Sequence, residues 1–244
     1  MQHTPIILRV TREQAEQAEG IVVVIDVIRA FTVAAYAFAG GAACLWLVRT
    51  VEEALALRER EPDALLAGEI GGRLIPGFDL NNSPSTMARA NVQGKHVIQR
   101  TGAGTQGAVG ARNSTHLLTA SLAVASATAR YVARLSANTG LPITFLPTET
   151  SAGGILRNED KYCADYIEAL ITQPETAADV LSDRLARLHA EGRFYHWGAE
   201  KDEDFPLEDL EQIQAADRFD FVMLGKRLEY QGFSYVELTA TQIP

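Results

Sequence analysis

Three carboxylates, Asp26, Glu69 and Asp79, stand at the end of short apolar runs or directly after them. The run before Asp26, residues 21–25, is continuous and β-branched, which is typical of a strand buried on both faces. In open parallel sheets, ligands bind at the carboxyl ends of such strands, and a charge there is rarely buried without a partner. Because Mg²⁺ prefers oxygen ligands, we predict that these carboxylates bind a metal and act as catalytic groups.

The residues near these carboxylates have the chemistry of an anion site. Arg29 follows Asp26 by three positions, and a guanidinium can hold a phosphate or sulfonate through two parallel hydrogen bonds. Asn82 and Ser83 lie in the polar segment Asp-Leu-Asn-Asn-Ser-Pro (79–84). We therefore predict that Arg29, Asn82 and Ser83 bind the anionic group of a substrate.

Some of these residues also fit purely structural roles, as alternatives to catalysis or ligand binding. Asp26 and Arg29 can form an ion pair at a capped helix start, and Glu69, between glycines, can be a solvated turn residue. Ser83 followed by Pro84 fits a helix N-cap with proline at the first helical position. This role and anion binding are compatible, because an anion can sit at a helix N-terminus.

Residues 101–107 match the pattern G-x-G-x-x-G after a predicted strand and before a predicted helix. A dinucleotide site also needs an acidic residue about 20 positions further on, and the first one is Glu149. A loop that cradles a single phosphoryl group fits better. The residues predicted to bind substrate there are Thr101, Gly102, Gly104 and Thr105. A nucleotide- or dinucleotide-dependent enzyme remains the alternative.

Two further carboxylates, Glu159 and Asp160, open a predicted helix. They are catalytic candidates of second rank, and they also fit ordinary first-turn charges favoured by the helix dipole. Cys163 in the same helix suits a core position better than a nucleophile. The chain has no Gly-Lys-Ser/Thr phosphate loop, and its five histidines lack zinc-like spacing.

Strand and helix patterns alternate over most of the chain, which predicts an α/β fold with three layers, α/β/α, around a largely parallel sheet. The predicted strands are 6–10, 21–26, 44–48, 65–69, 96–101, 116–120 and 143–146. The predicted helices are 30–39, 51–61, 102–112, 121–138, 158–171 and 177–189. The alternation of strand and helix patterns ends near residue 193. We expect a single domain over 1–244, with 193–244 as an appended segment in which 233–238 suits an edge strand.

The charge and composition of the chain limit the classes of partner that it is expected to bind. The 244 residues carry a net charge of −9, which argues against nucleic acid or an anionic membrane, and no apolar run has membrane-spanning length. Without a secretory signal or a disulfide framework, the expected location is cytoplasmic. Residues 80–148 contain no Asp or Glu, which favours a surface for a small anionic substrate, or else a buried alanine-rich segment. A homo-oligomer is compatible with these features, but none indicates one.

In their order along the chain, these motifs resemble the 2-phosphosulfolactate phosphatase family. The matching segments are Val-Val-Val-Ile-Asp-Val-Ile-Arg-Ala (22–30), Ala-Gly-Glu (67–69), Gly-Phe-Asp-Leu-Asn-Asn-Ser-Pro (77–84), Gly-Lys (94–95), Thr-Gly-Ala-Gly-Thr (101–105) and Glu-Asp-Lys-Tyr-Cys-Ala (159–164). The resemblance implies a Mg²⁺-dependent hydrolase that converts 2-phosphosulfolactate into sulfolactate and phosphate, in coenzyme M biosynthesis.

The chain also departs from the family pattern. The family usually has an arginine where this chain has Ile70, a glycine at Asn81, and Thr-Thr-Asn-Gly-Thr in place of Thr-Gly-Ala-Gly-Thr, so that a side-chain amide is lost at Ala103. Fewer anion-holding side chains favour a substrate other than a sulfonate, or a non-catalytic anion-binding relative.

Overall fold

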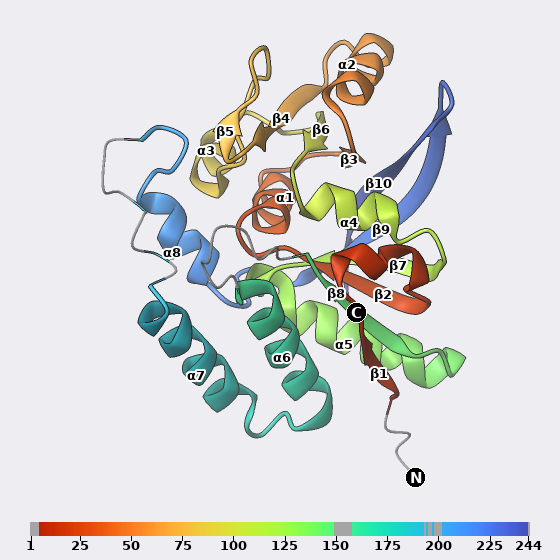
Figure 1. Ribbon diagram of the computed structural model, residues 1–244, viewed down its shortest axis with the longest axis vertical. Helices are drawn as coiled ribbons and strands as arrows, with labels where there is room; N and C mark the ends of the chain where they lie inside the picture. The colour runs from red at the N-terminus through yellow and green to blue at the C-terminus, as the bar shows by residue number, and fades with distance from the viewer. Residues whose placement is uncertain (1–4, 149–157, 193, 195–196, 198–201, 244) are drawn as a thin grey trace.

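The computed structural model describes residues 5–148, 158–192, 194, 197 and 202–243 (Figure 1). They form a ten-stranded sheet with helices on both faces, which confirms the predicted three-layer α/β fold. The strands are β1 (Ile7–Arg9), β2 (Gly20–Ile25), β3 (Cys44–Val48), β4 (Leu65–Ile70), β5 (Arg73–Leu74), β6 (His96–Arg100), β7 (Ser114–Ala120), β8 (Ile143–Pro147), β9 (Phe221–Tyr230) and β10 (Phe233–Gln242).

The six predicted helices are all present near their ranges, and α1 (Ala30–Ala39) matches its range at both ends. The other helices are α2 (Val51–Arg60), α3 (Pro84–Arg89), α4 (Gly104–Gly110), α5 (Ala125–Thr139), α6 (Glu159–Thr172), α7 (Ala177–Ala190), α8 (Glu208–Gln214) and the short 3₁₀ helices η1 (Arg12–Gln17) and η2 (Leu122–Val124). The helices η1, α3 and α8 lie outside the predicted ranges.

The sheet consists of two parallel halves joined by a hairpin. Strands β1, β8, β2 and β7 pair in parallel in that order, and so do β3, β6 and β4. The antiparallel hairpin β9–β10 lies between the halves, where β9 pairs with β7 and β10 pairs with β3. Residues 236–238 therefore have a partner strand on both sides, and the edge position expected for 233–238 is wrong.

The sheet is bent so that strand ends from both halves meet. The three antiparallel steps reverse the strand direction between the halves, yet the ends of β2, β4 and β6 line one cavity. Neighbouring strands rotate with a constant hand, and the two halves come to lie on either side of α1 and α4 (Figure 1). Helix α4 contacts β2 in one half and β3 in the other.

Apolar packing holds this arrangement. All six residues of β2 are buried, as expected for a strand covered on both faces. Helix α1 is buried over most of its surface, and its residues belong to the larger apolar cluster. A smaller cluster between α2 and the second half contains Trp46, Leu57 and Ile98.

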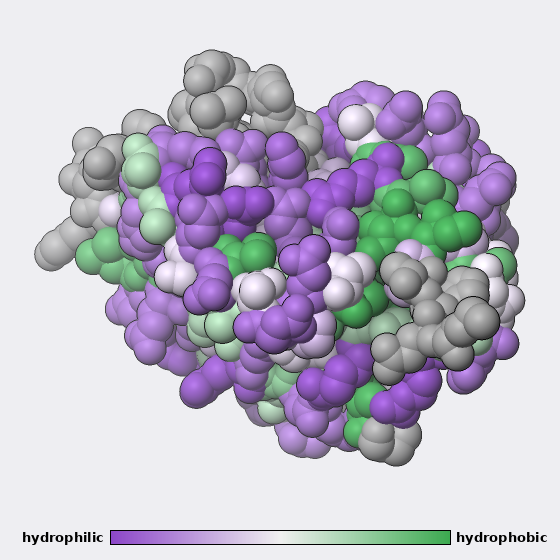
Figure 2. Space-filling view, turned by 90° about the horizontal axis from the view of Figure 1, so that it is seen from below, coloured by the Kyte–Doolittle hydropathy of each residue, from purple (hydrophilic) through white to green (hydrophobic). Residues whose placement is uncertain are grey.

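Helices α5, α6 and α7 form the layer below the first half of the sheet in Figure 1. Seen from that side, polar residues cover most of the surface, and apolar residues are exposed in one larger group and several smaller ones (Figure 2). This is the pattern of amphipathic helices that pack on a core through one face. Among the described residues, no helix has the length and apolar character needed to cross a membrane.

Candidate active site

The central cavity, about 340 Å³ in volume, opens at the ends of β2, β4 and β6. Six predicted site residues line it: Asp26, Arg29, Glu69, Asn82, Thr101 and Gly102. Ligands of α/β proteins bind at the carboxyl ends of the strands, and this cavity occupies that position. The structure thus brings together two of the three leading carboxylates and part of the predicted anion site.

Asp26 directly follows β2 and is 4% exposed. Its Oδ1 accepts a hydrogen bond from the backbone N–H of Ala30 at 3.0 Å, and its Oδ2 accepts one from the Thr148 hydroxyl at 3.4 Å. Burial, aided by the charges of Glu159 and Glu69, raises the pKa of Asp26 to about 6.

Within the described residues, the predicted ion pair of Asp26 with Arg29 is not formed, because Arg29 pairs with Asp209, and the N-cap of α1 is Arg29 without a side-chain cap bond. The Asp26 carboxylate instead accepts a hydrogen bond from the first helical N–H and faces the cavity.

Glu69 lies near the end of β4, and both of its oxygens accept backbone hydrogen bonds. Its Oε1 accepts from Gly102 and its Oε2 accepts from Gly72 at 2.7 Å. Gly68 precedes it with φ +154°, and a Cβ at Gly68 would lie 2.0 Å from the Arg100 carbonyl oxygen. The glycine therefore permits the close approach of β4 and β6 that places Glu69 at the cavity.

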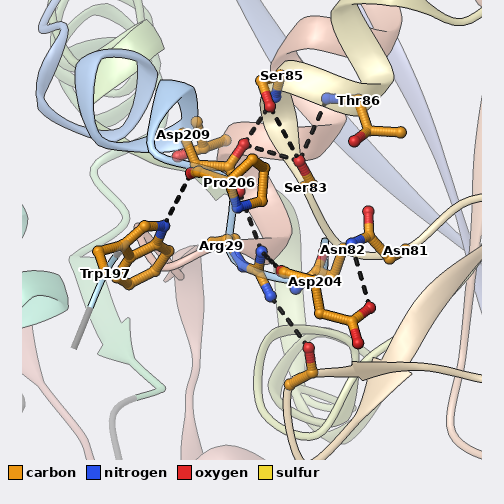
Figure 3. Close-up of polar contacts among 12 residues, drawn as sticks. Arg29, Asn81, Asn82, Ser83, Ser85, Thr86, Trp197, Asp204, Pro206 and Asp209 are labelled. Atoms are coloured by element: carbon orange, nitrogen blue, oxygen red, sulfur yellow. Dashed lines mark hydrogen bonds and ion pairs between the residues drawn. The ribbon is translucent and has the colours of Figure 1, made fainter. Parts of the chain in front are cut away.

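Arg29 is held in the cavity wall by the C-terminal part of the chain. Its Nη1 donates to Asp209 Oδ2 at 3.0 Å and to the Asp204 carbonyl at 2.6 Å, and its Nη2 donates to the Gly72 carbonyl at 3.3 Å (Figure 3). Its guanidinium carbon lies 4.6 Å from the centre of the Phe205 ring. Burial lowers the pKa of Arg29 and the charge of Asp209 counteracts this, so the side chain is a buried, paired cation.

The N-terminus of α3 is occupied by the protein itself. Ser83 is the N-cap and Pro84 the first helical residue, which confirms the predicted cap. Asp209 Oδ1 accepts hydrogen bonds from the Ser83 hydroxyl at 2.7 Å and from the Ser85 N–H at 2.9 Å (Figure 3). The anion at this position is thus the Asp209 carboxylate, and Ser83 contributes to the site through Asp209.

The segment around Asp204 ties this wall together. Asp204 Oδ1 accepts from the Leu74 N–H at 2.9 Å and from Asn81 Nδ2 at 3.4 Å. Phe205 and Trp197 line the cavity, and their rings pack edge to face at 5.5 Å. Sequence reasoning missed these residues and Asp209, because their contacts with Arg29 join positions far apart in the chain.

The segment 101–107 has an internal structure that explains its residues. The hydroxyls of Thr101 and Thr105 accept hydrogen bonds from each other's backbone N–H groups. A Cβ at Gly104 would lie 2.6 Å from Asp26 Oδ2, and one at Gly107 would lie 2.7 Å from the Thr148 side chain. These two glycines let α4 pack closely against the end of β2, and Thr105 acts on the shape of the loop.

Asp79 is not in the cavity. Its Oδ2 accepts hydrogen bonds from Arg58 Nη1 and from the backbone N–H of Leu66, both at 2.8 Å. Leu66 lies near the start of β4, whereas Glu69 lies near its end. The prediction that Asp79 shares a metal site with Asp26 and Glu69 therefore does not agree with this geometry, because the loop 71–84 returns Asp79 to the opposite end of the strand.

Glu159 and Asp160 begin α6 and are both buried. Asp160 Oδ1 accepts from the Val27 N–H at 2.7 Å, and its Oδ2 accepts from the Thr148 N–H at 3.2 Å. Asp160 therefore links the residue after Asp26 to the residue after the neighbouring strand β8. Glu159 lies close enough to raise the pKa of Asp26 by repulsion, and it remains a candidate in the reaction.

The donor set of the cavity fits a magnesium ion bound together with a substrate. Asp26 and Glu69 line the cavity and repel one another, as the raised pKa of Asp26 indicates, and a cation would relieve this repulsion. Within the described part of the chain, no three or more His, Cys, Asp or Glu side chains gather into a cation site. Proteins commonly hold Mg²⁺ with one or two carboxylates, water and substrate phosphate.

Arg12 is a second cavity residue that sequence reasoning missed. It belongs to η1, and its Nη1 donates to the Gly102 carbonyl at 3.3 Å. It lies in the segment Thr11-Arg12-Glu13-Gln14, where Thr11 and Gln14 form the reciprocal bonds of a capping box. Arg12 adds a second cation to the cavity wall.

Comparison with known proteins places the chain in a family. The family model described as 2-phosphosulpholactate phosphatase matches residues 7–225. A probable 2-phosphosulfolactate phosphatase of Bacillus subtilis (strain 168) is 45% identical over 161 residues, 65% of this chain and 68% of the relative. One of Deinococcus radiodurans is 48% identical over 112 residues, which span 46% of this chain and 47% of the relative, about half of each. Because the family model covers most of its length, the chain belongs to the 2-phosphosulpholactate phosphatase family.

Proposed function

We propose that this protein is a Mg²⁺-dependent phosphatase that hydrolyses the phosphate ester of a small acid. The named relatives support 2-phosphosulfolactate as the substrate, with sulfolactate and phosphate as products. The observation that carries the proposal is the central cavity, where Asp26 and Glu69 face Arg29 and Arg12. A role in coenzyme M biosynthesis and a cytoplasmic location belong to the same proposal, on sequence expectations alone.

Asp26 and Glu69 would hold the magnesium ion, which would neutralise charge on the transferring phosphoryl group and acidify a bound water. The protein holds both carboxylates with backbone hydrogen bonds from Ala30, Gly72 and Gly102. Phosphoryl transfer depends mainly on positioning and charge stabilisation. Fixed carboxylates of this kind bind an ion without a large cost in side-chain ordering.

Arg29 would bind an anionic group of the substrate. A guanidinium has five N–H donors, and the described partners of Arg29 use three of them. The Nε–H and one Nη2–H are left for a ligand. Because Asp209 and Asp204 hold the Nη1 side, the remaining donors have a defined direction, which is needed for bidentate binding of a phosphate or sulfonate.

The test is an assay of phosphate release from 2-phosphosulfolactate and a panel of small phosphate esters, with Mg²⁺ and with EDTA. We expect release that requires Mg²⁺ and is fastest with an ester that carries a second acidic group. No release from any ester by folded protein with Mg²⁺ would contradict the proposal and favour a non-catalytic anion-binding relative. Phosphate release that continues in EDTA would contradict only the Mg²⁺ requirement, and the phosphatase activity itself would stand.

The dinucleotide alternative has no observation in its favour. The close packing of Gly104 on Asp26 and of Gly107 on Thr148 accounts for two glycines of the pattern. The relatives are described as phosphatases.

A further inference from the structure

A second cavity, about 260 Å³ in volume, lies between η1 and α4. We call it the arginine cavity, and its wall contains Arg12, Arg49, Gln106 and Gly110 together with Ala15 and the two carboxylates Glu13 and Glu16. Arg12 also lines the central cavity. The two cavities are therefore neighbours that share one cation.

Arg49 lacks a partner for its charge. Within the described residues, no hydrogen bond or ion pair reaches its guanidinium, and its Nε is buried without a hydrogen-bond partner. Its backbone carbonyl is well satisfied, by Arg100 and by Gln106. Arg49 as a whole is partly exposed, but a buried N–H group is normally paired, so its Nε–H is a donor that the described protein leaves unused.

Other cations surround the arginine cavity. Burial lowers the pKa of Arg227, and the positive charges of Arg112 and Arg49 lower it further, so the three guanidinium groups lie close enough to repel one another. Arg227 donates to the carbonyls of Val109 and Ala111 at the end of α4. These contacts satisfy two of its five N–H groups, and carbonyl partners do not neutralise its charge.

The carboxylates nearby do not compensate Arg49. Glu13 lies 3.9 Å from Arg12 and its side chain is 72% exposed, while Glu16 lies 3.5 Å from Arg112 and is 65% exposed. Ion pairs this open to water are weak. A cavity beside an unpaired arginine, with only exposed carboxylates around it, is suited to an anion from solution.

We propose that the arginine cavity is a second oxyanion site, which binds a small oxyanion such as phosphate or a sulfonate through Arg49 and Arg12. The absence of a side chain at Gly110 leaves room, since a Cβ there would lie 3.5 Å from Arg49 Nη2. The site is distinct from the reaction centre. Gly104 at the start of α4 touches Asp26, whereas Gly110 ends the helix, and the rise of an α-helix separates the two by about 9 Å.

The oxyanion has two sources. It is either a free ion, such as inorganic phosphate, or a second acidic group of the substrate that reaches past Arg12. The site itself does not depend on the phosphatase proposal, because its evidence is the unpaired charge of Arg49. A negative result at the arginine cavity therefore leaves the proposed phosphatase activity untouched. A protein without phosphatase activity can likewise still bind an oxyanion in this cavity.

The probe is inorganic phosphate, titrated into protein with ¹⁵N-labelled arginine in the presence of EDTA, while the Nε–H signals are followed by NMR. The Arg49 signal is identified by its loss in Arg49→Lys. We expect it to shift and saturate in the wild-type protein, and to do so equally in Arg29→Gln, which alters the central cavity. An Arg49 signal that moves neither with millimolar phosphate nor with 2-phosphosulfolactate would overturn the proposal.

Calorimetry with two matched variants gives an independent measurement. Arg49→Gln should weaken phosphate binding at this site about tenfold or more, because hydrogen bonds from a charged donor are lost. Arg89→Gln removes the same charge from an exposed position in α3 and should leave the affinity unchanged. Equal weakening in both variants would mean that only net charge matters, and would contradict a specific site.

Substrate and free ion are distinguished in the inactive Asp26→Asn variant. If 2-phosphosulfolactate shifts the Arg29 and Arg49 signals at the same concentration, its second acidic group fills the arginine cavity. If phosphate shifts Arg49 but the ester shifts only Arg29, the ligand is a separate ion. Both results support an oxyanion site, whereas no shift of Arg49 with either compound rejects it.

Discussion

The two walls of the central cavity are built in different ways. The carboxylate wall, Asp26 and Glu69, is fixed mostly by backbone groups near the ends of β2, β4 and β6. The arginine wall, Arg29, is fixed by Asp204 and Asp209, which lie 175 and 180 residues further along the chain. The ends of the strands therefore position the candidate metal ligands Asp26 and Glu69. The C-terminal part of the chain positions the candidate substrate ligand Arg29.

The largest expected loss of activity follows from a substitution in the carboxylate wall. Glu69→Gln removes a charge that would bind the metal, and it should lower kcat/KM about 100-fold or more and raise the Mg²⁺ concentration needed. Asp79→Asn is the matched control, because Asp79 pairs with Arg58 outside the cavity. Steady-state kinetics against Mg²⁺ measure both variants. Equal losses in the two would contradict the separate positions of these carboxylates.

The next effect concerns the arginine wall. Asp209→Asn leaves Arg29 buried without its counter-charge, which should cost about 3 kcal/mol of unfolding free energy. The variant should also raise KM more than it lowers kcat, because Arg29 loses its fixed direction. Asp183→Asn breaks exposed pairs with Arg184 and Arg187 and should have a much smaller effect, because water screens such pairs. Urea unfolding and kinetics check this, and similar losses in both variants would argue against a positioning role.

The smallest effect is a pH dependence that belongs to the carboxylate wall. Because the pKa of Asp26 is raised from 3.8 to about 6, its contribution to stability is fully present below about pH 4 and is lost as the pH rises through 6. At 1.36 kcal/mol per pKa unit, the loss is about 3 kcal/mol before relaxation of the site. In EDTA, Asp26→Asn should therefore gain stability relative to the wild-type protein between these pH values.

Thermal unfolding from pH 4 to 8 measures this difference, and Mg²⁺ should reverse it by stabilising the wild-type protein. A stability difference that stays constant across this range would show that Asp26 is not a buried, destabilised carboxylate. The arginine wall should add no such dependence, because guanidinium groups stay protonated.

The parts of the fold that were predictable are those with a local pattern. Residues 21–25 form a continuous apolar run, and the strand and the buried Asp26 follow from it. The Ser83–Pro84 cap is a local signal as well, and the structure confirms it. Such features depend on neighbouring residues alone, so one sequence is sufficient to find them.

The parts that were not predictable depend on long-range contacts. Asp209 and Arg29 meet only after the chain has folded, and no spacing rule links them. Asp79 looked equivalent to Glu69 because the sequence does not reveal that its loop returns to the start of β4.

The β9–β10 hairpin looked peripheral because charged residues such as Arg227 and Glu237 interrupt its apolar pattern. In the structure both have partners, since Arg227 donates to the carbonyls of Val109 and Ala111 and Glu237 accepts from Trp46.

The most direct test of the central claim is the turnover of 2-phosphosulfolactate by Asp26→Asn with saturating Mg²⁺, compared with the wild-type protein. The cavity geometry predicts that phosphate release falls by a factor of about 1000 or more, while the variant stays folded and still binds the ester. Turnover close to that of the wild-type protein would remove Asp26 from the reaction and contradict the assignment of the central cavity as the active site.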